Sequence, residues 1–264
     1  MTATRTPAAN ATTRFSSRVE DYIKYRPSYP VEIVDLLADR CALTPESPIA
    51  DIGSGTGILT KLFLDNGNTV VGVEPNADMR AAADAWLSEY SQYGSMNGTA
   101  DATNLPGRSV DFVLAGQAFH WFDRDKTRTE WLRILRPGGW AVLIWNDRRV
   151  DSTPFLKEYE AVLNEFSTDY QDINHKNVQD LALLQPFFGG DLYEARFDNF
   201  QHFDLEGLIG RVASSSYAPE RGTEKFAEME KALSRIFAAH QKSGRVTFEY
   251  DTLVYYGQMS GQMV

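Results

Sequence analysis

Residues 49–67 read IADIGSGTGILTKLFLDNG, and this stretch decides the fold. A short apolar run leads into three glycines at alternate positions, and an apolar pattern with helical spacing follows and stops at Gly67. Glycine adopts positive φ at no steric cost, lets another molecule approach the main chain closely, and commonly follows the end of a helix. The stretch therefore predicts a buried strand, a tight turn that faces a ligand, and a helix.

The same alternation of strand and helix continues on both sides of this turn. Strands are expected over residues 47–53, 68–75, 95–100, 110–115 and 140–146, and helices over residues 31–43, 56–67, 76–90 and 126–135, the last ended by Pro137-Gly138-Gly139. Strands that alternate with helices through short connections predict a doubly wound parallel sheet with right-handed crossovers. Ligands of such sheets bind just beyond the carboxyl ends of the strands.

Beyond Val150 the pattern changes. Helices are expected over residues 155–166 and 224–240, and residues 195–204 and 245–257 alternate between apolar and polar side chains as strands do. The fold class predicted is α/β: a Rossmann-like, doubly wound, mostly parallel seven-stranded sheet with an antiparallel C-terminal edge and a helical cap over the crevice.

The domain organisation follows from the same change of pattern. Residues 1–14 are rich in Thr, Ala and Asn and are expected to be disordered. Residues 15–264 are expected to form a single domain, with its core over 31–150 and its cap and C-terminal strands over 151–264.

The composition argues against some classes of partner. The chain has 264 residues and a formal net charge of −10, whereas proteins that bind nucleic acid usually carry a basic face. Cys41 is the only cysteine, so a reducing compartment is expected. The first residues lack the apolar segment of a secretory signal, and no apolar run reaches membrane-spanning length. We therefore expect a cytoplasmic monomer or homodimer that binds a small-molecule substrate, with no nucleic-acid or membrane partner.

The residues around the glycine turn distinguish between nucleotide ligands. A dinucleotide fingerprint needs glycine at the third place of G-x-G-x-x-G, where this chain has Ile58, and no GK[ST] of a phosphate-binding loop follows. Asp51, placed at the mouth of the turn, would repel a pyrophosphate but suits a cofactor that carries an ammonium and a sulfonium. Glu74, at the end of the second strand, can accept hydrogen bonds from both hydroxyls of a ribose. NAD and S-adenosyl cofactors share this last signal.

These motifs resemble those of the class I S-adenosylmethionine (SAM) dependent methyltransferases. DIGSGTG is similar to the family's first motif, VVGVEP to the second, GTADATNLP and VDFVLAGQAFHW to the third and fourth, and LRILRPGGWAVLIWN to the turn and fifth strand that follow. Within the class, YIKYRPSYP and AFHWFD are similar to the small-molecule branch that includes trans-aconitate methyltransferases, over short motifs only. The resemblance implies a methyltransferase type 11 domain with SAM as cofactor.

The resemblance also implies which residues contact that cofactor. They are Tyr25, Arg26, Asp51, Gly53, Ser54, Gly55, Glu74, Pro75, Met79, Asp101, Ala102 and Gln117. Arg26 is expected near the carboxylate of SAM, and Asp101 together with the N–H of Ala102 at the adenine. A surface helix end is the alternative for Tyr25 and Arg26, and a core position is the alternative for Met79.

Candidate residues for the acceptor follow the fourth and fifth strands. His120 is the candidate catalytic base, because an imidazole titrates near neutrality, and a role in shaping the pocket floor is equally compatible with its position. Phe119 and Trp121 are expected to pack against the substrate, Arg148 to bind a substrate carboxylate, and Tyr217 to line the cap. Core packing, a solvated loop and a helix end are the alternatives for these residues. The four histidines lack metal-ligand spacing, so no metal is expected.

The function expected is transfer of a methyl group from SAM to O, N or C of a small molecule, with a carboxylate among the candidate acceptors. A carboxylate needs no base, whereas a hydroxyl acceptor does. Two alternatives stay open. One is an NAD(P)-dependent oxidoreductase, which Ile58, Asp51 and the lack of a Tyr-x-x-x-Lys pattern disfavour. The other is a regulator that binds SAM without catalysis.

Overall fold

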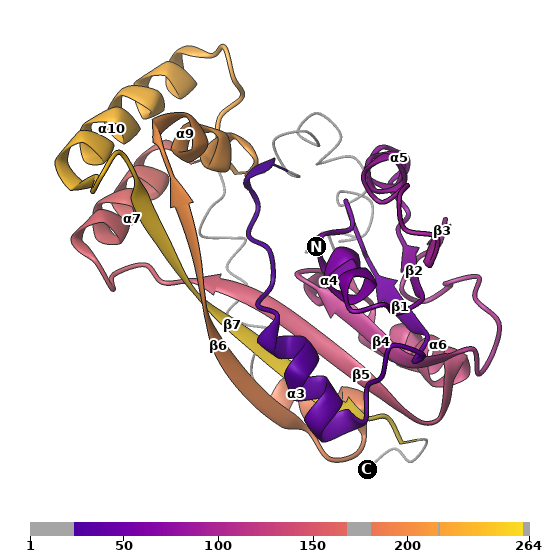
Figure 1. Ribbon diagram of the computed structural model, residues 1–264. Coiled ribbons are helices and arrows are strands. Elements are labelled where there is room, and N and C mark those ends of the chain that lie inside the picture. The colour runs from indigo at the N-terminus through magenta and orange to yellow at the C-terminus, as the bar shows by residue number, and fades with distance from the viewer. Residues whose placement is uncertain (1–23, 168–180, 216, 261–264) are drawn as a thin grey trace, which may run out of the picture.

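One seven-stranded sheet forms the centre of the molecule. The computed structural model describes residues 24–167, 181–215 and 217–260, so the expected disordered segment 1–14 lies outside the described residues. The strands are β1 (Ile49–Ile52), β2 (Val70–Val73), β3 (Tyr93–Met96), β4 (Val110–Gly116), β5 (Leu135–Arg148), β6 (Tyr193–Phe203) and β7 (Val246–Gln258). Their order across the sheet is β3-β2-β1-β4-β5-β7-β6 (Figure 1).

The directions of the strands confirm the predicted fold class. The first five strands pair in parallel, and β7 runs antiparallel to both β5 and β6. The order reverses beside β1, with β2 on one side and β4 on the other, which is the kind of switch point where ligands bind in open α/β sheets.

Helices cover both faces of the sheet. On one face, α3 (Glu32–Cys41) and α4 (Ile58–Asp65) share a core with the apolar side chains of β1, β2, β4, β5 and β7. On the other face, α6 (Arg124–Ile134) and α8 (Leu181–Phe188) bury Trp131, Phe187 and Phe188 against β1, β4 and β5. Between β2 and β3, the chain forms α5 (Ala77–Trp86), whose first turn is capped by the side chain of Asn76.

The later helices form a lobe on the extended strands. α7 (Pro154–Phe166), α9 (Leu205–Ala213) and α10 (Glu224–His240) enclose a separate core with the ends of β6 and β7, and they lie at the far end of these strands from α6 (Figure 1). The sequence predicted no helix over α8, which packs beside α6 because its phenylalanines complete the core there. We call α7, α9 and α10 the helical lobe.

Two strand boundaries differ from the prediction. The helix α6 was expected to be ended by Pro137-Gly138-Gly139, but β5 already begins at Leu135, which pairs with Val110. A register shift between Val110 and Phe112 accommodates the extra residues, and Gly138 takes a φ of +80° there. β3 ends at Met96 instead of near residue 100, because Thr99 and Ala102 form a tight bridge of their own.

Within the described residues, no helix is both long enough and apolar enough to cross a lipid bilayer. Cys41 is buried at the end of α3.

Candidate functional site

The glycine loop after β1 has the backbone that the sequence predicts. Gly53, Gly55 and Gly57 have φ values of +69°, +56° and +87°. Residues with a Cβ rarely adopt such values. A Cβ on Gly53 would lie 2.7 Å from the Cβ of Ala118, beyond the end of β4. The loop therefore sits directly against the neighbouring strand end, at the switch point of the sheet.

The N–H groups of this loop point into the protein. Those of Gly53 and Ser54 donate to the carbonyl of Val73 at 2.8 Å and 3.2 Å, and that of Gly57 donates to Ser54 at 2.9 Å. The N–H of Gly55 donates to Oε2 of Glu74 at 3.0 Å. A loop that binds phosphate instead directs such groups at its ligand. The N–H groups of four of the five residues 53–57 are therefore already used within the protein.

Glu74 directly follows β2 and is almost fully buried, at 7% exposed. Its Oε1 accepts the N–H of Asn76 at 2.8 Å. Burial raises the pKa of this carboxyl, and the hydrogen bonds from Asn76 and Gly55 act in the opposite direction. A carboxylate oxygen has two lone pairs, so each oxygen of Glu74 can accept one further hydrogen bond.

The neighbours of Glu74 shape the same region. Asn76 caps α5 by accepting the N–H groups of Asp78 and Met79. The buried sulfur of Met79 lies 3.8 Å from where a Cβ on Gly55 would stand, so it packs against the loop. Pro75 is half-buried between them. The side chain of Ser54 instead lies over β2, 2.9 Å from the position of a Cβ on Gly72.

Asp51 is buried and does not stand at the mouth of the turn as the sequence suggested. It is 1% exposed, because it lies within β1 and its Oδ2 accepts the hydroxyl of Thr60 at 2.6 Å. Burial raises the pKa of Asp51 to about 7, and the nearby charge of Glu74 adds to the rise. Its other oxygen, Oδ1, is buried and accepts no hydrogen bond from the described residues. An orphaned carboxylate oxygen of this kind fits a ligand that brings a cationic donor.

The N–H of Ala102, expected at the adenine, has a partner within the protein. The N–H of Ala102 donates to the carbonyl of Thr99 at 3.1 Å, so the donor is already used. Asp101 is exposed, and its Oδ1 accepts the hydroxyl of Thr99 at 2.7 Å. Asp101 retains acceptor capacity on a solvent-facing loop, so its contact with adenine stays a prediction.

Gln117 joins β4 to β5 at the carboxyl edge of the sheet. It has a φ of +56°, its N–H donates to Ile144 at 2.9 Å, and its side chain donates to the carbonyl of Asn146 at 2.9 Å. His120 and Trp121 follow in the short helix η2 (Phe119–Trp121), half-buried, with ring centroids 4.9 Å apart. Both rings therefore lie just past the strand end, as predicted.

Phe119 is a core residue, and the expected substrate contact is not compatible with its position. It is 1% exposed, and its ring packs against those of Trp131, Trp145 and Phe187. The reason is the turn of η2, which directs this side chain to the face covered by α6 and α8.

The segment before α3 connects the helical lobe with the sheet edge. Tyr25 is 7% exposed and packs on α9, where a Cβ on Gly210 would come within 2.1 Å of its ring. Arg26 donates to the carbonyl of Ser214 at 2.9 Å. Further along, the hydroxyl of Tyr29 lies 2.5 Å from where a Cβ on Gly116 would stand. The structure thus places Tyr25 and Arg26 against the helical lobe, and their contact with a cofactor stays a prediction.

Two arginines at the end of β5 hold the helical lobe to the strands. Arg148 forms an ion pair with Glu160 of α7, and its guanidinium lies 4.9 Å from the ring centre of Tyr159. Arg149 pairs with Asp198 and, at 2.6 Å, with Asp251. Ion pairs within the protein satisfy Arg149, and the substrate contact expected of Arg148 stays a prediction.

Tyr217 lies on the inner side of the lobe and is half-buried. Burial raises the pKa of its phenol, but the positive charges of Arg211, Arg26 and Arg148 outweigh this, and the net shift of the pKa is downward.

Sequence reasoning missed Arg211, because one arginine in an amphipathic helix is normally solvated. It also missed Asn146 and Tyr29, which line the sheet edge.

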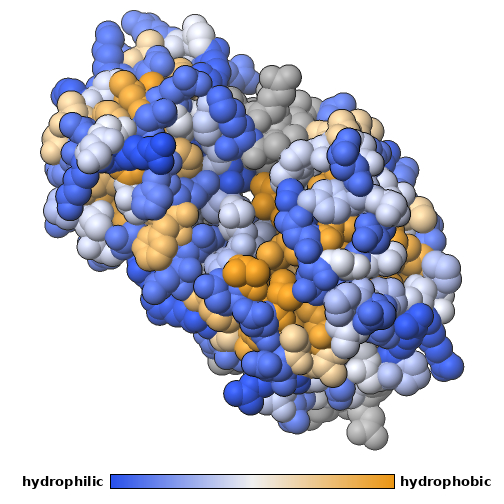
Figure 2. Space-filling model, viewed as in Figure 1, coloured by the Kyte–Doolittle hydropathy of each residue, from blue (hydrophilic) through white to orange (hydrophobic). Residues whose placement is uncertain are grey.

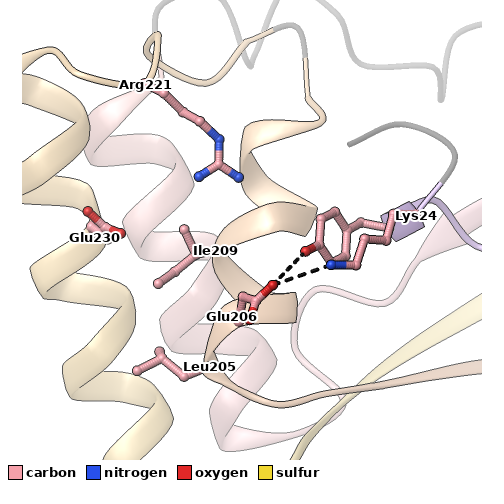
Figure 3. Close-up of a pocket in the computed structure, with 7 residues that line it drawn as sticks. Lys24, Leu205, Glu206, Ile209, Arg221 and Glu230 are labelled. Atoms are coloured by element: carbon pink, nitrogen blue, oxygen red, sulfur yellow. Dashed lines mark hydrogen bonds and ion pairs between the residues drawn. The ribbon is translucent and has the colours of Figure 1, made fainter. Parts of the chain in front are cut away.

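The surface between the lobe and the sheet is hollowed, as Figure 2 shows. A second hollow of about 600 Å³ opens between Lys24 and the helices α9 and α10 (Figure 3). Charges of both signs line it, and its Lys24 already pairs with Glu206 at 3.3 Å. This second hollow lies away from the glycine loop and carries none of the residues described there except Tyr25.

Comparison with known proteins agrees with this geometry. The family model described as "Methyltransferase domain" matches residues 50–143. An uncharacterized methyltransferase of Mycobacterium tuberculosis is 30% identical over 242 residues, covering 90% of this chain and 93% of its own. An uncharacterized methyltransferase-like protein of Schizosaccharomyces pombe is 31% identical over 246 residues, covering 91% of this chain and 93% of its own.

A solved structure has the same fold. It is described as a type II methyltransferase from Anaeromyxobacter dehalogenans, superposes with a TM-score of 0.69 at 20% identity, and matches 90% of this chain and all of its own. The glycine loop, the acid after β2 and the strand order thus occur together in a chain with full-length methyltransferase relatives. This chain belongs to the methyltransferase family.

Proposed function

We propose that this protein transfers a methyl group from SAM to a small-molecule acceptor. The observation that carries the proposal is the pair of buried carboxylates, Asp51 and Glu74, beside a glycine loop in which most N–H groups are already bonded within the protein. This arrangement repels a pyrophosphate and suits a ribose that carries a cationic amino-acid tail. The net charge of −10 supports a small-molecule acceptor over a nucleic acid.

The residues that would hold the cofactor lie around the glycine loop. The free lone pairs of Glu74 would accept the two ribose hydroxyls, and Oδ1 of Asp51 would face the ammonium group. Met79, already packed on Gly55, would contact the adenosine, and Gln117 borders the crevice on the other side. The cofactor supplies an electrophilic methyl group on a sulfonium.

The chain's contribution to the reaction is mainly positioning. Methyl transfer is an in-line displacement, and holding two reactants in line can supply on the order of 7–11 kcal/mol of barrier reduction. His120 and Trp121 stand at the strand end where the acceptor would enter. With a hydroxyl acceptor, His120 would remove the proton of the hydroxyl. With a carboxylate acceptor no base is needed, and His120 and Trp121 would only form part of the pocket wall.

Isothermal titration calorimetry tests the cofactor. S-adenosylhomocysteine, the demethylated product, should bind one site per chain, and NAD⁺ at the same concentration should not bind. If NAD⁺ binds and S-adenosylhomocysteine does not, the result favours the NAD(P)-dependent oxidoreductase. A screen of metabolites with methyl-labelled SAM then identifies the acceptor, and binding without transfer to any metabolite would favour a regulator.

A further inference from the structure

A buried arginine in the helical lobe has no role in the proposed cofactor site. Arg211 of α9 is 6% exposed and lies among Tyr159 and Tyr250, each 1% exposed. Its Nε donates to the hydroxyl of Tyr250 at 3.4 Å, and its Nη1 donates to the hydroxyl of Ser215 at 3.0 Å. Both partners are neutral hydroxyls, so they orient the guanidinium without compensating its charge.

Arg211 forms no ion pair with a carboxylate of the described residues. By contrast, its neighbours Arg148 and Arg149 both pair with acids. A guanidinium keeps its proton at all accessible pH values, so Arg211 cannot lower the cost of burial by becoming neutral. A buried charge is normally paired, and a protein that maintains an uncompensated one gains something else from it.

Two segments connect the surroundings of Arg211 with the end of β4. Arg26, which donates to the carbonyl of Ser214 after α9, is three residues from Tyr29, whose hydroxyl meets the end of β4 at Gly116. Three extended residues span about 10 Å. Along β5, Arg148 is four residues beyond Ile144, the partner of Gly116, which is about 13 Å. Measured along these two segments, Arg26 and Arg148 lie about 10–13 Å along the chain from residues at the end of β4.

Further positive charge converges on the same place. The pKa of Tyr217 is lowered by Arg211, Arg26 and Arg148 against the effect of its burial. The three guanidinium groups come from different parts of the chain, namely α9, the segment before α3 and the end of β5. Of these, Arg148 is compensated by Glu160, whereas Arg211 has no carboxylate partner among the described residues.

We propose that Arg211 binds an anionic group of the acceptor, a carboxylate or a phosphate, that is not itself methylated. Tyr250 and Ser215 orient the guanidinium, whose remaining N–H groups form a fork that fits either anion. The acceptor's reacting atom would lie near His120, at the end of β4. The proposal rests on the proposed function, because it assumes that methyl transfer takes place at the end of β4.

The first test needs no knowledge of the acceptor. Arg211→Met removes a charge that lacks an acid partner, so it should raise Tm by about 2 °C or more in a buffer without small anions. The matched control is Arg133→Met. Arg133 pairs with Glu130 at 2.7 Å, and its removal leaves the buried carboxylate of Glu130 without its ion-pair partner, so this variant should lower Tm.

The second test uses defined anions on the full-length chain. Succinate or inorganic phosphate should raise the Tm of the unmodified protein, whereas neutral succinamide should not. Arg211→Met should lose this anion response, Arg211→Lys should retain part of it, and Arg133→Met should retain all of it. A larger response to succinate than to phosphate identifies a carboxylate, and the reverse order identifies a phosphate.

Either of two results overturns the proposal. One is a fall in Tm for Arg211→Met comparable with that of Arg133→Met, because Arg211 is then a structural residue. The other is an anion response that is the same with and without Arg211. Arg211→Met should bind S-adenosylhomocysteine with unchanged affinity. If the unmodified protein does not bind S-adenosylhomocysteine at all, the proposed function itself has failed.

Discussion

The carboxylate of Glu74 accepts the N–H of Gly55 across 3.0 Å and so ties the end of β2 to a loop 19 residues earlier in the chain. The same carboxylate accepts the N–H of Asn76, which begins α5. One acid therefore fixes the shape of the glycine loop and the start of the next helix. Its remaining lone pairs face the switch point of the sheet, where the ligand is expected.

Glu74→Gln should weaken the binding of S-adenosylhomocysteine by about 10- to 100-fold. The amide keeps the size of the side chain, but it loses hydrogen bonds to a charged acceptor, which are worth about 1.5–3 kcal/mol. Calorimetric titration of the purified variant measures the loss. Glu89→Gln, which changes an exposed carboxylate beyond α5, is the control and should bind as the unmodified chain does. Equal affinities of both variants would remove Glu74 from the ribose site.

Asp51 should make the free protein less stable as the pH rises. Its pKa is about 7 in the folded protein against 3.8 for an ordinary aspartate, so the folded state binds the proton more tightly. This contribution to the free energy of unfolding is fully present below about pH 4 and is lost as the pH rises through about 7. Asp51→Asn should therefore gain Tm over the unmodified chain at pH 8 but not at pH 5.

Scanning calorimetry of both proteins at these two pH values isolates the effect, because every other titrating group is common to them. If the difference in Tm between the two proteins is the same at both pH values, Asp51 is ionised in the folded protein at both. Binding supplies a second check. An ammonium group needs the ionised carboxylate, so the affinity for S-adenosylhomocysteine should fall below pH 7 in the unmodified protein, and Asp51→Asn should bind weakly throughout.

Gly53→Ala should destabilise the fold by more than its backbone strain alone. The new Cβ would stand 2.7 Å from that of Ala118, and Gly53 has a φ of +69°. Gly222→Ala is the matched control, because Gly222 has a φ of +84° and a Cβ there meets nothing within 4 Å. Strain of this kind costs about 1–3 kcal/mol at either position, so the difference between the variants reports the contact with Ala118. Urea unfolding should show Gly53→Ala to be the less stable, and equal losses would mean that the loop can move away from Ala118.

His120→Gln should lower kcat by about 10²- to 10⁴-fold on a hydroxyl acceptor, which is the usual effect of removing a general base. The pH–rate profile distinguishes this role from that of a pocket wall. Loss of a base removes the acidic limb of the profile, whereas loss of packing shifts the whole curve down without changing its shape. Trp121→Phe is the control, because it alters the neighbouring ring and leaves the imidazole in place. A profile of unchanged shape in His120→Gln would contradict the assignment as base.

The local elements of the fold could be predicted from the sequence because their signals are local. The turn at Gly53, the acid after β2 and the exact span of α10 follow from spacing and capping patterns within a few residues. Pro137-Gly138-Gly139 misled because the same residues that end a helix also make a bulge, and the pairing of Leu135 with distant Val110 decided between them. α8 gave no helical signal, since it contains Pro186 and owes its place to the core beside α6.

The candidate site could be predicted where a residue directly follows a strand and not where it depends on tertiary contacts. Glu74 lies just beyond the end of β2, and Gln117 and His120 lie just beyond the end of β4, as the sequence predicts. The N–H of Ala102 was assigned to adenine, but a bridge to Thr99 uses it, and such a bridge has no sequence signature. Arg211 was invisible for the same reason, because its burial arises only when α9 packs on β7 and the segment before α3.

The central claim is that the glycine loop and Glu74 bind the adenosyl group of SAM, and a crystal structure of the complex with S-adenosylhomocysteine tests it most directly. The account predicts both ribose hydroxyls within hydrogen-bonding distance of the Glu74 carboxylate and the amino group facing Oδ1 of Asp51. A ligand bound elsewhere, or a ribose held by other residues while Glu74 keeps only its bonds to Gly55 and Asn76, would contradict it.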